Sequence, residues 1–169
     1  MKGQSPRDQI ALLDDEFARL HRNACELARI VLLELPEVPP DGGQTAPFRK
    51  EILRGAAVVE QTFGGITANL WDDPFEWTLP ETLNTPELLI EYLNEVEATR
   101  RRAFDSLSGD EDLAREIVVP SGERQTLLSL FRETISRAAA FQDRAFEIRD
   151  RAPGRPDLNQ TITNAANDY

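Results

Sequence analysis

Apolar residues recur at intervals of three and four along much of this chain, a spacing that places them on one face of an α-helix. The first stripe consists of Ile10, Leu13, Phe17, Leu20, Ala24, Leu27 and Val31. Ser5 and Pro6 precede it in the order typical of a helix start, with serine as the N-cap and proline at the first helical position. The segment "LPEVPPDGGQTAP" then predicts a connecting loop.

Two more stripes predict a second and a third helix. The second consists of Phe48, Ile52, Ala56, Val59, Phe63, Ile66 and Leu70. Gly64 and Gly65 near its end either admit a neighbouring backbone or mark a frayed terminus. Thr85 as N-cap and Pro86 in the first turn begin the third helix. Its stripe is Leu89, Leu93, Val96, Ala103 and Leu107, and Arg100 interrupts it.

The last predicted helix spans residues 126–151, after a stretch without helical character. In that stretch, "EIVV" followed by Pro120 and "SGER" predicts a short extended segment and a turn. The residues expected to face inward from the last helix are Leu128, Phe131, Ile135, Ala138, Gln142 and Ala145, with Leu127, Phe141 and Ile148 on its flank. The pattern predicts an all-α four-helix bundle over residues 1–151 and a polar tail over residues 152–169.

The charge balance narrows the range of partners. Thirty acidic and 19 basic residues give a net charge of -11. Nucleic acids and anionic membranes are bound mainly through Lys and Arg, so we expect neither as a partner. The first ten residues, "MKGQSPRDQI", lack the apolar core of a signal peptide, and no apolar run approaches the length of a membrane span. With a single cysteine, no disulfide can form within the chain, and we expect a cytoplasmic protein.

The candidate chemistry is sparse. A di-iron site built from two Glu-x-x-His pairs needs more histidine than the one this chain contains. His21 and Cys25 lie four residues apart on the first helix, so they share a face. They are either a reactive thiol–imidazole pair or half a zinc site, or else a half-exposed histidine beside a packed cysteine.

Other polar groups have structural interpretations that weigh against functional ones. The carboxylate pairs Asp143/Glu147 and Glu91/Glu95 are either acid–base groups or parts of a solvated face. The run of arginines at 100–102 is either a counter-charge to acidic helices or a site for an anion or a partner. Trp71 and Trp77 either cover an end of the bundle or contact a ligand.

The order of the segments resembles the DinB superfamily. The resemblance covers most of residues 8–151 and is carried by "EILRGAAVVEQTF", the loop rich in Trp and Pro, "TPELLIEYLNEVEATRRRAFDSL" and "EIVVPSGERQTLLSLFRETISRAAAFQDRAFEIR". It implies an up-up-down-down four-helix bundle that commonly dimerises. It also implies a divalent metal held by three histidines, one on the second helix and two spaced H-x-x-x-H on the last, which activates low-molecular-weight thiols. The family name refers to induction by DNA damage.

This chain departs from the family at all three metal-ligand positions. Aligned with the family, Gly55 takes the place of the histidine on the second helix, and Arg137 and Phe141 take those on the last. None of the three can supply a family-like ligand, so we expect no metal and no other cofactor, and a pocket that is apolar and cationic.

The leading functional hypothesis is therefore a metal-free binding module. Its partner would be another protein or a small anionic ligand at Gly55, Arg137 and Phe141, and a homodimer is expected from the family resemblance. One alternative is an enzyme, either a thiol-dependent S-transferase-like protein or a hydrolase, that uses Cys25, His21 or carboxylates. The other is a structural or regulatory homodimer, induced by stress or DNA damage.

Overall fold

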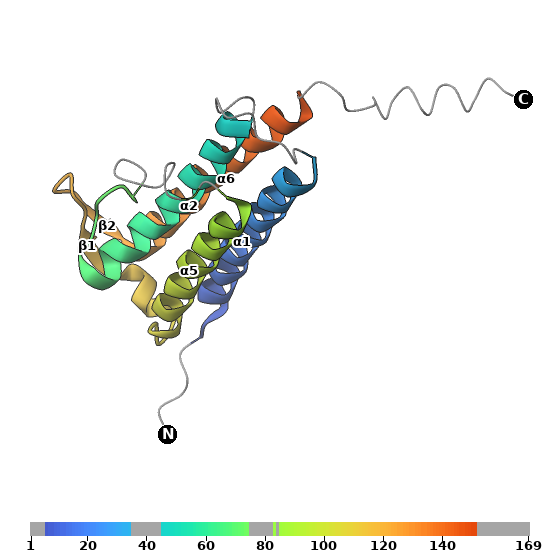
Figure 1. The fold of residues 1–169 in the computed structure, drawn as a ribbon. Helices are drawn as coiled ribbons and strands as arrows, with labels where there is room; N and C mark the ends of the chain where they lie inside the picture. Colours follow the sequence, from blue (N-terminus) through green and yellow to red (C-terminus); the bar gives the residue numbers. More distant parts are fainter. Residues whose placement is uncertain (1–5, 35–44, 75–82, 84, 152–169) are drawn as a thin grey trace, which may run out of the picture.

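The computed structural model describes residues 6–34, 45–74, 83 and 85–151. Four long helices lie side by side around one apolar core: α1 (Asp8–Glu34), α2 (Thr45–Ala68), α5 (Pro86–Asp105) and α6 (Leu127–Asp150) (Figure 1). The predicted all-α class is confirmed. Within the described ranges, no helix combines the length and the hydropathy needed to cross a membrane.

Between α5 and α6 lie a short 3-10 helix, η1 (Asp110–Ala114), and an antiparallel pair of strands, β1 (Glu116–Val118) and β2 (Arg124–Thr126). The strands pair in the register Glu116↔Thr126, Ile117↔Gln125 and Val118↔Arg124. Gly122 lies in the turn between them with a φ of 83°, a conformation that glycine adopts without strain. The predicted extended segment and turn before the last helix are confirmed.

The directions of the helices differ from the expected up-up-down-down order. The Phe17 ring on α1 lies 5.2 Å from the Phe63 ring on α2, while Leu20 and Ala24 lie near Gly55 around one cavity, so α1 and α2 are antiparallel. Similar contacts make α1 antiparallel to α5 and α2 antiparallel to α6. The order is therefore up-down-down-up (Figure 1). Apolar stripes fix which face of a helix is buried, but not its direction.

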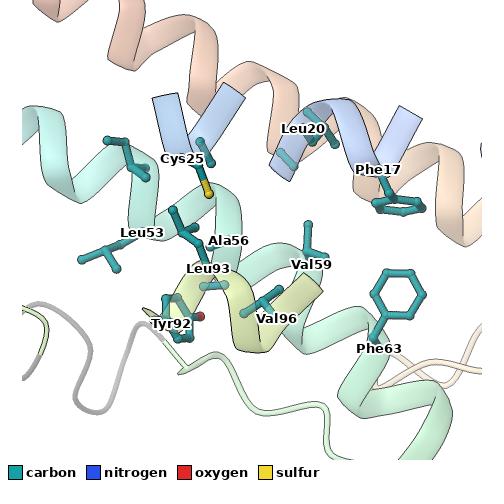
Figure 2. Packing of buried hydrophobic residues seen from close by; sticks show 14 of the residues in the cluster. Phe17, Leu20, Cys25, Leu53, Ala56, Val59, Phe63, Tyr92, Leu93 and Val96 are labelled. Atoms are coloured by element: carbon teal, nitrogen blue, oxygen red, sulfur yellow. The ribbon is translucent and has the colours of Figure 1, made fainter. Parts of the chain in front are cut away.

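The core centres on four phenylalanine rings, one from each long helix. Phe17, Phe63, Phe104 and Phe131 contact one another in all six pairings, with ring centroids 5.2–6.0 Å apart. Edge-to-face and stacked geometries both occur among them, and each such pair adds about 0.5–1.5 kcal/mol beyond the area it buries. Figure 2 shows Phe17 and Phe63 facing each other beside aliphatic residues from α1, α2 and α5.

The predicted stripes of the first three helices are largely buried. The exceptions are Leu70, which lies beyond α2 and is 61% exposed, Ile66, which is half-buried, and Val31, whose side chain lies outside the described part. The prediction for α6 needs correction. Leu127 and Thr134 are fully buried, whereas Leu128 and Ile135 are only partly buried, so the buried face is rotated by one residue at this end.

Local hydrogen bonds account for the helix starts. Thr85 caps α5 by accepting from the Leu88 amide at 3.3 Å, and Thr126 caps α6 by accepting from the Ser129 amide at 3.2 Å. At the start of α1, the Asp110 carboxylate of η1 accepts from the amides of Gln9 and Ile10. The predicted N-cap Ser5 lies outside the described residues, so Asp110 is the cap that the structure shows.

Gly64 and Gly65, near the end of α2, leave room for close neighbours. A Cβ atom at Gly65 would lie 2.3 Å from the ring of Trp71, and one at Gly64 would lie 3.1 Å from the Leu70 carbonyl oxygen. Asn69 adopts the left-handed conformation that turns the chain back, with a φ of 56°. Trp71 therefore packs on the end of α2, while Trp77 and the tail 152–169 lie outside the described residues.

Candidate binding site

A small, largely apolar cavity lies in the interior, where all four long helices meet. Its volume is about 30 Å³, enough for a water molecule or a monatomic ion. The polar side chains that line it are His21, Glu97, Arg100 and Gln142. Gly55, Ala56 and Ala138 and several larger apolar residues complete the wall. A carboxylate or phosphate ligand would need the helices to move apart.

The three residues expected at the degenerate metal site are only partly brought together. Gly55 lines the cavity, but Arg137 is exposed on α6 and Phe141 is half-buried, and neither lines the cavity. Ala138 and Gln142 line it instead, with the same spacing of four residues. The structure therefore shifts the expected α6 positions by one residue and places Arg137 outside the interior.

α2 and α6 pack against each other at Gly55. A Cβ atom at Gly55 would lie 3.4 Å from the Ala138 carbonyl oxygen and 3.5 Å from the Phe141 Cβ atom. These are ordinary van der Waals contacts, but they leave no room for a long side chain pointing in this direction. The α2–α6 contact therefore closes one side of the cavity.

The cation at the cavity is Arg100, which interrupts the apolar stripe of α5. It is 1% exposed, and its guanidinium group donates to both carboxylate oxygens of Glu97, at 2.8 Å from Nε and from Nη2. Nη1 donates to Asp14 of α1. Arg101 donates from its own Nε to Glu97 at 2.8 Å. Two guanidinium groups and two carboxylates thus form one network in which the formal charges cancel.

This network fixes the charge states of its members. Burial alone would raise the pKa of Glu97, but hydrogen bonds and charges from Arg100 and Arg101 lower it below its ordinary value. For Arg100, burial is likewise outweighed by Glu97 and Asp14, so its pKa is raised and the side chain stays cationic. The guanidinium carbon also lies 5.1 Å from the centre of the Phe104 ring, a cation–π contact.

His21 and Cys25 are adjacent, as their spacing predicted. The Cys25 sulfur lies 3.6 Å from His21 Nε2. Burial lowers the pKa of the imidazole and raises the pKa of the thiol, with nearby charges acting as smaller causes. Both shifts favour the neutral forms, whereas an activated nucleophile needs a thiolate. Cys25 is also only 5% exposed, so this geometry favours the packed-cysteine alternative.

Gln142 closes the α6 side of the cavity. Its amide nitrogen donates to the Leu20 carbonyl oxygen of α1 at 2.7 Å, and the side chain is buried. In the described part of the chain, no three His, Cys, Asp or Glu side chains are grouped so that they could hold a metal ion. Asp143, Glu147, Glu91 and Glu95, the carboxylates of the two predicted pairs, are all exposed, as expected of a solvated face.

The second candidate site is an open groove between α1 and α5. It has a volume of about 610 Å³ and lies on the other side of Arg100, which lines both spaces. Ile10 and Phe104, both nearly fully buried, contribute apolar surface to it, together with the small side chains of Ala11 and Ala18. Its charged lining consists of Arg7, Arg22, Arg100, Arg101, Asp14, Asp15 and Asp105.

Comparisons with known proteins give no relative from which the function of the site could be inferred, so the site is interpreted from its own geometry. No family model, no curated protein and no solved structure matches this chain.

The central position of Arg100 in the interior was not predicted from the sequence. A signal was present, because a cation within an apolar stripe, three residues after a glutamate, is the spacing of an ion pair within a helix.

Proposed function

We propose that this chain is a DinB-like four-helix bundle that functions by binding a small charged molecule in the α1–α5 groove. One structural observation supports the resemblance to the DinB superfamily. Gly55 of α2 and the pair Ala138/Gln142 of α6 line the same cavity, in the one-plus-two arrangement that the family uses for its histidines. The helix order of the resemblance is not part of the proposal, because the directions observed differ.

The proposed location of the binding site depends on the position of Arg100. On its inner side, the guanidinium group faces a cavity of about 30 Å³ and is neutralised by Glu97 and Asp14. On its outer side lies a groove of about 610 Å³, within the range of about 300–1,000 Å³ typical of ligand sites. A ligand larger than an ion therefore finds space in the groove and not in the interior.

The groove also offers charges for recognition. Arg101 is 66% exposed and Arg22 is exposed at the same end, and both lie near enough to His21 to lower its pKa. This pair supports a small anionic ligand, as expected from the sequence, with the groove as its proposed site in place of Arg137. Arginine is suited to this role because its guanidinium group can donate two hydrogen bonds to one carboxylate or phosphate.

The test is a thermal-shift screen with three probes: inorganic phosphate, succinate and trialanine. At least one probe should raise the unfolding temperature of the native protein, and Arg22→Gln should remove that increase. Arg137→Gln is the matched control, since it removes the same charge from an exposed position on α6. Stabilisation by none of the probes, or a loss that follows Arg137 and not Arg22, would contradict the proposed function.

The homodimer expected from the resemblance is a separate part of the proposal. Sedimentation at micromolar concentration should give twice the mass of the chain, which is 19.0 kDa. A monomer at that concentration would remove the dimer while leaving the groove and its ligand untouched.

A further inference from the structure

The charges that line the α1–α5 groove are divided along its length. Arg22 and Arg101 are the cations at one end, both close to His21. Toward the other end lie Asp15 of α1 and Asp105 of α5, and Arg7 there donates to the Phe104 carbonyl oxygen at 3.4 Å. The groove is therefore cationic at one end and contains exposed carboxylates toward the other.

Three of these charges have no partner that the structure shows. Within the described residues, Arg22, Asp15 and Asp105 form no hydrogen bond or ion pair through their side chains, and all three are exposed. Asp14, Arg100 and Arg101, by contrast, are held in the network around Glu97. The groove thus presents one arginine and two aspartates that are free to bind a ligand.

The spacing of these groups sets the length of a matching ligand. Asp15 and Arg22 lie seven residues apart on the same face of α1, which is about 10 Å along the axis at about 1.5 Å per residue. An extended peptide spans about 3.3–3.6 Å per residue, so about three residues cover that distance. A free peptide of this length carries an ammonium group at one end and a carboxylate at the other.

We propose that the groove binds a short zwitterionic peptide of about three residues, with its carboxylate at Arg22 and Arg101 and its ammonium group at Asp15 and Asp105. On α1, Ala18 lies between Asp15 and Arg22, and Ile10, Ala11 and Phe104 add apolar surface to the groove near Asp15 and Asp105, which suits uncharged side chains. This inference rests on the proposed function and adds the chemical class of the ligand.

The experiment is calorimetric titration with trialanine, N-acetyl-trialanine and trialanine amide. Trialanine should bind saturably, and blocking either end should weaken its affinity about tenfold, the loss expected for one charge-assisted contact. Arg22→Gln should lower the affinity for trialanine by a similar factor, but should not lower the affinity for trialanine amide any further. Asp15→Asn should in turn leave the affinity for N-acetyl-trialanine unchanged, because acetylation has already removed the contact between the ammonium group and Asp15.

Matched controls and contradictory results separate this inference from the proposed function. Arg137→Gln and Asp143→Asn remove one charge of each sign from exposed positions on α6 and should leave trialanine binding unchanged. If phosphate or succinate binds in a manner that depends on Arg22 but trialanine does not bind up to about 10 mM, the zwitterion is excluded and the proposed function remains. Equal affinities for the free and blocked peptides would also overturn the inference. If no probe binds, both proposals fail.

Discussion

The Arg100 guanidinium group binds the Glu97 carboxylate through two parallel hydrogen bonds of 2.8 Å, one turn apart on the same helix. Both side chains are almost completely buried, at 2% and 9% exposure. A buried ion pair often adds little net stability, because desolvation costs about as much as the attraction returns. Its consequence here is architectural: it fills the interior with a neutralised cation and leaves the outer groove as the accessible charged space.

Breaking this pair should destabilise the fold strongly. We expect Glu97→Gln to lower the free energy of unfolding by about 3–5 kcal/mol, because it leaves a buried guanidinium group without its main counter-charge. The measurement is urea unfolding at pH 7. The double variant Arg100→Met/Glu97→Leu should recover most of the loss, since apolar side chains can replace a buried pair.

The pair Glu16/Arg19 supplies a matched control, with the same residue types at the same spacing on a solvated helix face. There Glu16→Gln should cost at most about 1 kcal/mol. A similar small cost at Glu97 would show that the buried pair is in fact open to water.

The single histidine provides a test of the interior by pH. Burial lowers the pKa of His21, and Arg100, Arg101 and Arg22 lower it further against the opposing charge of Glu97. Because the folded pKa lies below the unfolded value, the unfolded state binds a proton first as the pH falls. Stability should therefore decline as the pH drops below about 6.5, until the folded pKa is passed.

An NMR titration of the imidazole protons gives this pKa without ambiguity, since the chain has one histidine. A midpoint below 6.5 is expected, and a midpoint above that value would place His21 in an open, acidic environment instead. His21→Gln should reduce the loss of stability between about pH 6.5 and pH 5.

Thiol reactivity separates the binding hypothesis from the enzymatic alternative. Cys25 is buried and its pKa is raised, so iodoacetamide should modify the native protein far more slowly than the urea-unfolded chain at pH 7. The chain has a single cysteine, so mass spectrometry reports this site alone. Rapid alkylation of the folded protein below pH 7 would instead support the S-transferase-like alternative.

Two glycines within α2 should respond in opposite ways to alanine. At Gly55 the added methyl group finds ordinary contacts at 3.4 and 3.5 Å, so Gly55→Ala should stabilise the helix by about 0.5–1 kcal/mol. At Gly65 it would meet the Trp71 ring at 2.3 Å, so Gly65→Ala should lower the melting temperature and alter tryptophan fluorescence. Equal effects of the two substitutions would contradict the packing described around Gly55 and Gly65.

Spacing alone predicted much of the helical architecture. The stripes of α1, α2 and α5 and the cap Thr85 are visible in sequence because burial and capping are local requirements. The buried face of α6 was harder to define. Adjacent apolar pairs such as Leu127/Leu128 compete for the same face, and only packing against the rest of the bundle decides between them.

The interior site could not be predicted in the same way. Arg100 binds Asp14, which lies 86 residues earlier in the chain, and no periodic pattern reports a partner at that separation. The shift from Arg137/Phe141 to Ala138/Gln142 has the same origin, since one residue of rotation exchanges a solvated side chain for a buried one. Helix directions likewise depend on contacts between distant segments.

The most direct test of the buried Arg100 side chain and the accessible groove is an NMR spectrum of the assigned arginine Nε–H groups. It would be recorded in titrations with phosphate and, separately, with trialanine. We predict that the Arg100 signal is protected from exchange with water, that the Arg22 and Arg101 signals shift when a probe binds, and that the Arg137 signal does not move. A rapidly exchanging Arg100, or shifts confined to Arg137, would contradict the account.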